Sequence, residues 1–74
     1  MKPQLERLVK AFDAYMEAEP GPEGRRLQAL YRTTLEQTAE VLKLDKEVLE
    51  RNLKLYYPRW LRAGRKFPTI PPKA

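Results

Sequence analysis

The sequence contains no cysteine, no histidine and no serine, and these absences remove most of the usual catalytic chemistry. Without cysteine there are no disulfides, zinc knuckles or thiol nucleophiles. Without histidine the commonest general base and the commonest transition-metal ligand are missing, and without serine no serine-based triad can form. Only three glycines occur, none in a phosphate-loop pattern. The sequence therefore predicts a protein that is not an enzyme and that uses no metal and no cofactor.

Long hydrophobic runs are also absent. No uninterrupted apolar stretch approaches the roughly 20 residues that a membrane-spanning helix needs, and the first ten residues, MKPQLERLVK, contain no apolar core of signal-peptide length. We therefore expect one small cytoplasmic domain with no membrane partner. Asparagine occurs once, whereas arginine occurs eight times and proline seven times. Few thermolabile residues combined with many charges and prolines are typical of a thermophile.

Acidic residues are absent from the last third of the chain. Residues 1–50 hold eight basic and ten acidic residues, a net charge of −2, whereas residues 51–74 hold seven basic residues and no acid, a net charge of +7. One or two basic residues at a helix end complement the helix dipole, but seven exceed that need. The asymmetry indicates a polyanionic partner.

The hydrophobic periodicity predicts an all-α fold, a small bundle of three helices or of three plus one short helix. Apolar residues recur at helical spacing over residues 3–18, 23–43 and from 46 onward. A segment dense in proline and glycine, residues 19–24, separates the first two helices, and Asp45 is a good N-cap for the third. The third helix either continues through Pro58 with a kink or breaks at Tyr57, leaving a short fourth helix at 59–63.

The chain divides into a helical domain, residues 1–64, and a basic tail, residues 65–74. Gly64 is expected to end the last helix. The sequence RKFPTIPPKA is too rich in proline for a helix and is typical of an extended, polyproline-like segment.

Aromatic residues are interleaved with the basic ones near the end of the chain. Tyr56 and Trp60 share a helical stripe with Leu49 and Leu53, so we expect both rings to pack in the core. The pattern leaves Tyr57 undecided between core and surface.

Val48 and Leu55 lie on the basic side of the third helix, and together with Leu44, just before that helix, they form a second apolar edge. A minimal three-helix bundle buries one face of each helix, so a second apolar edge needs another neighbour. Either the tail folds back on it or a second copy of the chain covers it. Because chains of this size often gain stability by association, we predict a homodimer with these three residues in the interface.

Residues 38–57, TAEVLKLDKEVLERNLKLYY, resemble the helix-turn-helix segment of the Fis family and related bacterial regulators. Ala39 stands at the position of the family's small residue before the turn, and Asp45 opens the would-be recognition helix. Leu49 and Leu53 match its apolar positions, and Lys54-Leu55-Tyr56 matches the closing basic-x-Tyr. The sequence departs from the family at Lys43, where the family usually has glycine, and in carrying Asp45, Glu47 and Glu50 at the start of the helix. The resemblance implies DNA binding by the second helix of the motif, and residues 38–57 also fit an ordinary pair of bundle helices.

Taken together, these patterns predict a small nucleic-acid-binding accessory or transcription-regulatory protein, with DNA favoured over RNA. Its affinity would come mainly from phosphate contacts, which position a protein without reading sequence. The residues expected to make the contacts are Lys46, Arg51, Lys54, Arg59, Arg62, Arg65 and Lys66.

A second hypothesis from a different class fits the same residues. The basic, aromatic and proline-rich end of the chain could dock on an acidic surface of a larger protein, because an extended segment such as FPTIPP loses little entropy on binding. The chain would then be an adaptor or inhibitor with a larger protein partner.

Overall fold

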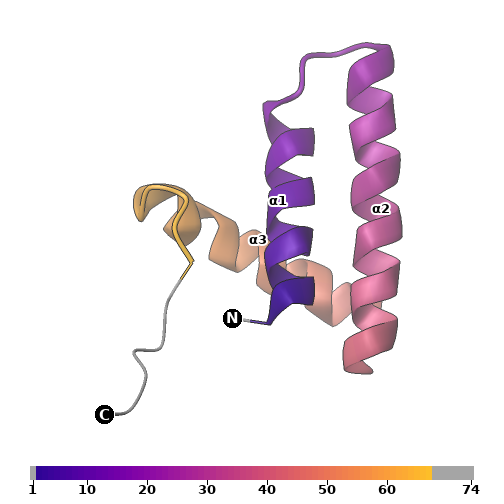
Figure 1. The fold of residues 1–74 in the computed structure, drawn as a ribbon, viewed down its shortest axis with the longest axis vertical. Coiled ribbons are helices and arrows are strands. Elements are labelled where there is room, and N and C mark those ends of the chain that lie inside the picture. The colour runs from indigo at the N-terminus through magenta and orange to yellow at the C-terminus, as the bar shows by residue number, and fades with distance from the viewer. Residues whose placement is uncertain (1, 68–74) are drawn as a thin grey trace.

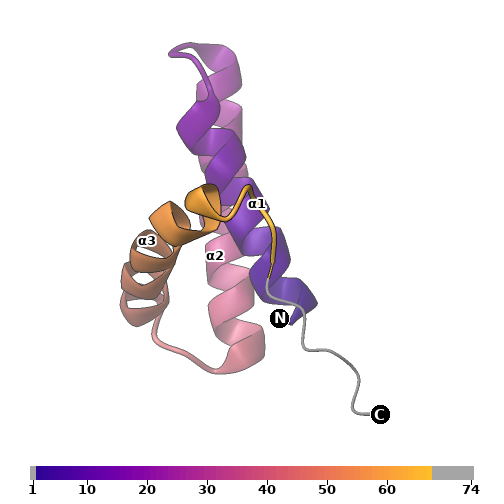
Figure 2. The same ribbon diagram turned by 90° about the vertical axis from the view of Figure 1, so that its left-hand side faces the viewer.

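The computed structural model describes residues 2–67, which form three helices: α1 (Pro3–Glu17), α2 (Pro22–Leu42) and α3 (Lys46–Arg62). Helices α1 and α2 lie side by side and run in opposite directions, and α3 crosses behind them (Figure 1). The view from the side shows α3 on one face of this pair (Figure 2). The expected all-α, three-helix fold is confirmed, and residues 68–74 of the extended tail predicted for 65–74 lie outside the described residues. No helix of the described part combines the length and apolar character needed to cross a membrane.

Helix α3 continues through Pro58 to Arg62, as the first of the two alternatives predicts, and the alternative break at Tyr57 with a short fourth helix at 59–63 does not occur. Proline removes one helical hydrogen bond, and here the loss occurs on the exposed side of the helix, where water can satisfy the freed carbonyl. Tyr57 and Trp60, on either side of the proline, are both buried and hold the helix against α1.

The core lies where the three helices meet, and aromatic rings dominate it. Phe12 is at its centre, with its ring centroid 4.9 Å from that of Tyr57, 5.0 Å from Tyr31 and 6.5 Å from Tyr15. Each helix therefore contributes at least one ring to a single cluster. The buried apolar residues are Leu8, Val9, Phe12, Tyr31, Leu35, Ala39, Leu49, Leu53, Tyr57 and Trp60.

The predicted core stripe of the third helix is confirmed at Leu49, Leu53 and Trp60 and is only partly correct at Tyr56. Tyr57, which the pattern left undecided, is buried, whereas Tyr56 is half-buried at the edge of the core. Some apolar residues of α1 and α2 remain exposed, because α3 covers only part of the α1–α2 pair. Met16, Leu30 and Val41 have relative exposures of 55%, 53% and 58%.

The ends of α2 and α3 use the same backbone motif with different residues. The amide of Leu44 donates to the carbonyl of Ala39, and the amide of Arg65 donates to that of Trp60. In both turns the residue before the donor is left-handed: Lys43 with φ 55° and Gly64 with φ 76°. This Schellman arrangement satisfies carbonyls at the helix end and favours glycine at the left-handed position. Lys43 thus adopts the conformation that glycine provides without steric cost.

Replacing Lys43 with glycine is therefore expected to raise the free energy of unfolding, by about 0.5–1 kcal/mol, because an L-residue in this region costs about 1–2 kcal/mol. Urea denaturation followed by circular dichroism measures the change. Lys43→Ala is the matched control, since it removes the charge and keeps Cβ. A Lys43→Gly variant no more stable than Lys43→Ala would contradict this account of the turn.

Candidate nucleic-acid interface

The solvent-facing side of α3 carries arginines and apolar residues in alternation. Leu49, Leu53 and Trp60 face the core, and the opposite side of the helix is exposed throughout its length. Among residues 2–67, Arg51, Arg59 and Arg62 take part in no ion pair, and all three are exposed. Their guanidinium groups are therefore available to an external anion. The exposed residues of this side include Val48, Arg51, Leu55, Pro58, Arg59 and Arg62.

The two lysines predicted for the same site have partners inside the chain. Lys46 Nζ lies 3.6 Å from a carboxylate oxygen of Glu36 on α2, and Lys54 Nζ lies 3.8 Å from Glu50 Oε1. Both pairs are largely exposed to solvent, and such pairs contribute little stability. The lysines are accordingly less committed to an outside anion than the three arginines, although a phosphate could compete for them.

Arg65 points toward α1 and is held by two carboxylates. Its Nε lies 3.2 Å from Asp13 Oδ2 and its Nη2 lies 3.0 Å from Glu17 Oε1. Asp13 also accepts a 2.8 Å hydrogen bond from the hydroxyl of Tyr57. The carboxylate of Asp13 thus joins α1, α3 and the residue that follows the α3 turn.

The residues that follow Arg65 also contact the helical domain. Phe67 packs against Trp60 with ring centroids 5.4 Å apart, and Lys10 Nζ lies 5.8 Å from the centre of the Phe67 ring. Residues 65–67, which begin the predicted tail, therefore contact the helical domain. Lys66 between them is exposed.

The Tyr57 hydroxyl makes stability sensitive to alkaline pH. Burial, and then the hydrogen bond to Asp13, raises the pKa of Tyr57 to about 12 from its ordinary value of 10. Between these values the unfolded chain loses the proton first, so the free energy of unfolding falls as pH rises from 10 to about 12. We expect Tyr57→Phe to flatten this fall, as measured by urea denaturation at several pH values. A pH dependence identical to that of the unmodified protein would contradict the assigned role of the hydroxyl.

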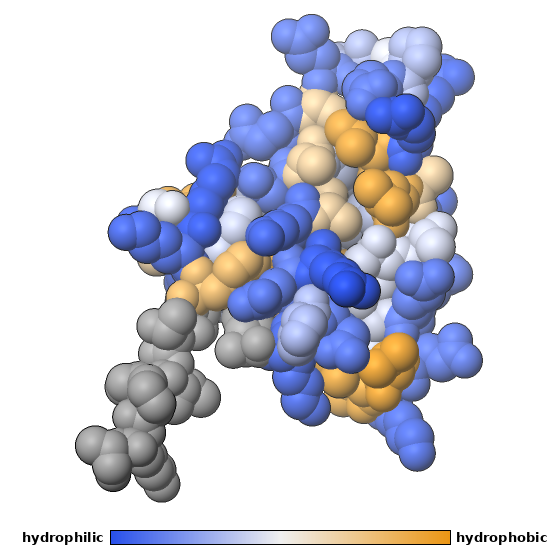
Figure 3. Space-filling view, in the orientation of Figure 1, coloured by the Kyte–Doolittle hydropathy of each residue, from blue (hydrophilic) through white to orange (hydrophobic). Residues whose placement is uncertain are grey.

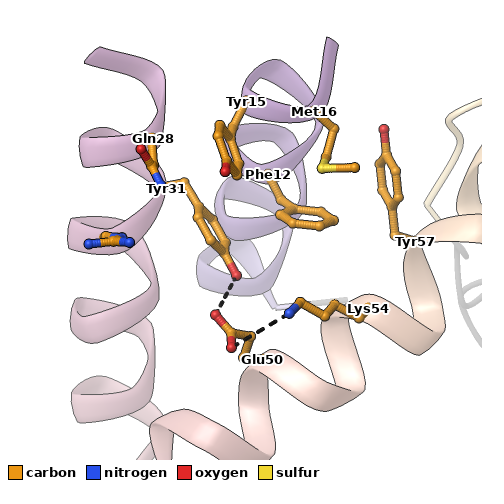
Figure 4. Close-up of a pocket in the computed structure, with 9 residues that line it drawn as sticks. Phe12, Tyr15, Met16, Gln28, Tyr31, Glu50, Lys54 and Tyr57 are labelled. Atoms are coloured by element: carbon orange, nitrogen blue, oxygen red, sulfur yellow. Dashed lines mark hydrogen bonds and ion pairs between the residues drawn. The ribbon is translucent and has the colours of Figure 1, made fainter. Parts of the chain in front are cut away.

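A second tyrosine–carboxylate pair joins α2 to α3. The hydroxyl of Tyr31 donates to Glu50 Oε2 over 3.2 Å, and Lys54 approaches the other oxygen of the same carboxylate (Figure 4). Burial raises the pKa of Tyr31 above its usual range, and the charge of Glu50 adds to the effect. Glu50 is consequently turned toward α2 and away from the arginine-bearing side of α3.

The three residues predicted to form a dimer interface are all exposed. Leu44, Val48 and Leu55 have relative exposures of 47%, 44% and 68%. Val48 and Leu55 lie on the same side of α3 as Arg51. Within residues 2–67 the apolar edge on α3 has no covering element, and the dimer stays a prediction.

Figure 3 shows the face of the molecule with α1 and α2 in front. It is mostly hydrophilic, with small apolar patches between the two helices and over the lower end of α2. No group of three or more acidic side chains able to hold a metal ion occurs in the described part of the chain.

Sequence reasoning missed the two carboxylates that receive tyrosine hydroxyls. The side chain of Asp13 is only 19% exposed, and it accepts from Tyr57 and pairs with Arg65. Glu50, one of the acids at the start of the would-be recognition helix, accepts from Tyr31 on α2. The only indication in the sequence was that a single acidic residue stands beside an apolar stripe that contains tyrosine. This pattern is too common to predict a tyrosine–carboxylate hydrogen bond. Comparison of the chain with protein-family models, with curated proteins and with solved structures finds no match.

Proposed function

We propose that this protein binds nucleic acid, with duplex DNA as the principal ligand, through the solvent-facing side of α3. The observation that carries the proposal is the set of three exposed arginines, Arg51, Arg59 and Arg62, which have no acidic partner within residues 2–67. Arginine binds phosphate with a planar, bidentate donor group that lysine lacks. Lys66 adds a fourth exposed cation just beyond the helix.

Two features of the α2–α3 turn support the helix-turn-helix interpretation. Lys43 has the left-handed backbone that the family's turn glycine usually supplies. Glu50 is hydrogen bonded to Tyr31, so one of the three acids that would repel phosphate is directed elsewhere. In the folded chain, therefore, Lys43 adopts the backbone conformation of the family's glycine, and Glu50 is directed away from a bound phosphate.

The start of α3 favours contacts with the DNA backbone over contacts with bases. Asp45 caps the helix by accepting a hydrogen bond from the amide of Glu47, 2.8 Å away, and both acids are exposed. A negative N-terminal turn is repelled by phosphates on both sides of a groove, whereas the arginines lie farther along the helix. Such a distribution gives affinity without strong sequence preference.

A direct binding measurement tests this function. The purified protein is titrated into a fluorescein-labelled 20-base-pair duplex and, separately, labelled poly-glutamate of similar length, and anisotropy is recorded. We expect the duplex to bind at least ten times more tightly, because duplex DNA has a higher charge density and releases more counterions on binding. Equal affinity for both polyanions would remove the case for nucleic acid.

The exposed apolar edge supports a homodimer as the form that binds DNA. Pairing two chains along Val48 and Leu55 would bury the edge and place two arginine-bearing helices side by side. We expect Leu55→Glu to leave the fold intact, since Leu55 is 68% exposed, while splitting the dimer and sharply reducing DNA affinity. Light scattering at about 100 μM, where mass action favours the dimer, gives the oligomeric state.

The matched control is Leu30→Glu, which changes a 53% exposed leucine on α2. It should alter neither the mass nor the affinity. A monomeric unmodified protein, or a Leu55→Glu variant that unfolds, would show that the dimer prediction is wrong.

A second candidate function is favoured by the apolar residues between the arginines. Val48 and Leu55 would be unused on a DNA backbone if the protein were monomeric, but they suit an apolar groove on a larger protein whose acidic rim pairs with the arginines. In that case the protein is an adaptor. Deleting residues 65–74 would also remove the contacts of Arg65 and Phe67, so the sharper variant deletes residues 68–74 only. Loss of a protein partner with DNA binding retained would favour the adaptor.

A further inference from the structure

An open pocket of about 420 Å³ lies on the side of α3 that faces α2. Its volume is within the range of pockets that bind small organic groups. Figure 4 shows Tyr31 and Tyr57 on opposite sides of the opening, with Phe12 between them and Met16 beside Tyr57. Tyr15 stacks nearly parallel to Tyr31, with an interplanar angle of 11° and centroids 5.8 Å apart, and extends the same wall.

Two of the three tyrosines that line the pocket have hydrogen-bonded hydroxyls. The hydroxyl of Tyr31 donates to Glu50 and that of Tyr57 donates to Asp13. Phe12, Tyr31 and Tyr57 are only 5–8% exposed, so most of the apolar surface that a ligand could contact comes from the half-buried Tyr15 and the 55% exposed Met16. A planar, partly apolar group is the kind of ligand that such a lining accepts.

The charges around the pocket select for a ligand that carries an anion. Arg32, Lys54 and Glu50 line it, which gives a net positive charge, and Glu50 is engaged by Tyr31 and Lys54. Arg32 is exposed and has no ion pair among the described residues. Gln28 adds an amide that can both donate and accept hydrogen bonds at the edge of a ring.

We propose that this pocket binds one unpaired nucleobase of a nucleic-acid strand, with the adjoining phosphates on Arg32 and Lys54. Unpaired bases are commonly held by stacking on aromatic side chains, and every base has a face that can stack. The inference rests on the proposed nucleic-acid function and deepens it, because it adds a site for a single strand or for a base displaced from a duplex.

The position of the pocket connects it with the arginines of α3. Lys54 borders the pocket, and Arg51 is one helical turn away on the same helix. A strand leaving the pocket over Lys54 therefore meets Arg51 next. The pocket and the solvent-facing side of α3 are continuous parts of one binding surface.

The test compares a 12-nucleotide oligothymidine and a 12-nucleotide oligouridine with the 20-base-pair duplex, each labelled and titrated by anisotropy. Gln28→Trp fills the pocket with an indole and is expected to weaken both single strands roughly tenfold, the size of one stacking contact, and the duplex less than twofold. Arg32→Gln should weaken the single strands about threefold by removing one phosphate contact. Arg25→Gln, an exposed arginine of the same helix outside the pocket, is the matched control and should have a smaller effect.

A spectroscopic measurement on the unmodified chain keeps the proposal testable if Gln28→Trp does not fold. The sequence has two methionines, Met1 and Met16, so methyl labelling gives two signals. The Met16 methyl group borders the pocket and should shift when oligothymidine binds, because the ring of a bound base lies next to it. An unchanged Met16 signal at saturation would overturn the proposal.

The outcomes separate the pocket from the function on which it rests. If filling the pocket changes neither single-strand affinity while the duplex still binds, the pocket inference fails and the proposed function stands. If neither single strand nor duplex binds the unmodified protein, both fail. If Gln28→Trp weakens the binding of only one of the two single strands, the result supports the pocket and shows whether its ligand is DNA or RNA.

Discussion

Replacing Arg51, Arg59 and Arg62 with glutamine is expected to weaken duplex DNA binding by about 10²-fold at 0.1 M salt, because each lost phosphate contact removes the release of about one counterion. All three side chains are exposed, and within residues 2–67 they have no acidic partner whose loss would destabilise the fold. The circular dichroism spectrum and the melting temperature should therefore stay close to those of the unmodified protein. Anisotropy titration with the 20-base-pair duplex measures the change in affinity.

The control for this variant removes the same charge from another part of the surface. Arg7 on α1 and Arg25 and Arg26 on α2 are exposed, and replacing them with glutamine lowers the net charge by the same amount. If binding depends on the α3 side, this control should lose much less affinity. Equal losses in the two triple variants would mean that total charge, and not the side of α3, determines binding.

The largest effect on stability is expected from Phe12→Ala. The Phe12 ring contacts the rings of Tyr15, Tyr31 and Tyr57 and is 5% exposed. Removing a buried phenylalanine costs about 3–5 kcal/mol through lost burial and the cavity left behind, and a chain of this length has about 4–11 kcal/mol in total. Urea denaturation should show a strong drop in the midpoint or a chain that is largely unfolded in water.

Met16→Ala on the same helix is the matched control for Phe12→Ala. Its side chain is 55% exposed, so the free energy of unfolding should change by less than about 1 kcal/mol. A Phe12→Ala variant as stable as Met16→Ala would contradict the assignment of Phe12 to the centre of the core.

The helices could be predicted from the sequence because each one combines a regular apolar stripe with local start and stop signals. Pro3 begins α1, Asp45 caps α3, and Gly64 takes the left-handed position after it. These features depend on residues close together in the chain. The continuity of α3 through Pro58 was left open because it depends on whether Tyr57 and Trp60 are both buried, which only the packing of the three helices decides.

The ion pairs of the site were less predictable, because they join residues that are far apart in the sequence and meet only when the helices pack. A charge pattern does not tell which of the seven basic residues assigned to the interface have acidic partners within the fold. Arg65 pairs with Asp13, 52 residues away, because α3 crosses α1. Glu50 faces Tyr31 on α2 because α3 also crosses that helix. The arginines left on the solvent side are identified only after these pairs are known.

The salt dependence of duplex binding tests the central claim most directly. The measurement is the slope of log K against log salt concentration for the unmodified protein and for the variant with Arg51, Arg59 and Arg62 replaced by glutamine. Arg51, Arg59, Arg62 and Lys66 give about four phosphate contacts per chain, so we expect a slope of about −4 for one chain on the duplex and about −7 for a dimer. The triple variant should have a slope near −1 for each bound chain. A slope near zero for the unmodified protein, or the same slope for both proteins, would contradict the claim that the solvent-facing side of α3 binds nucleic acid.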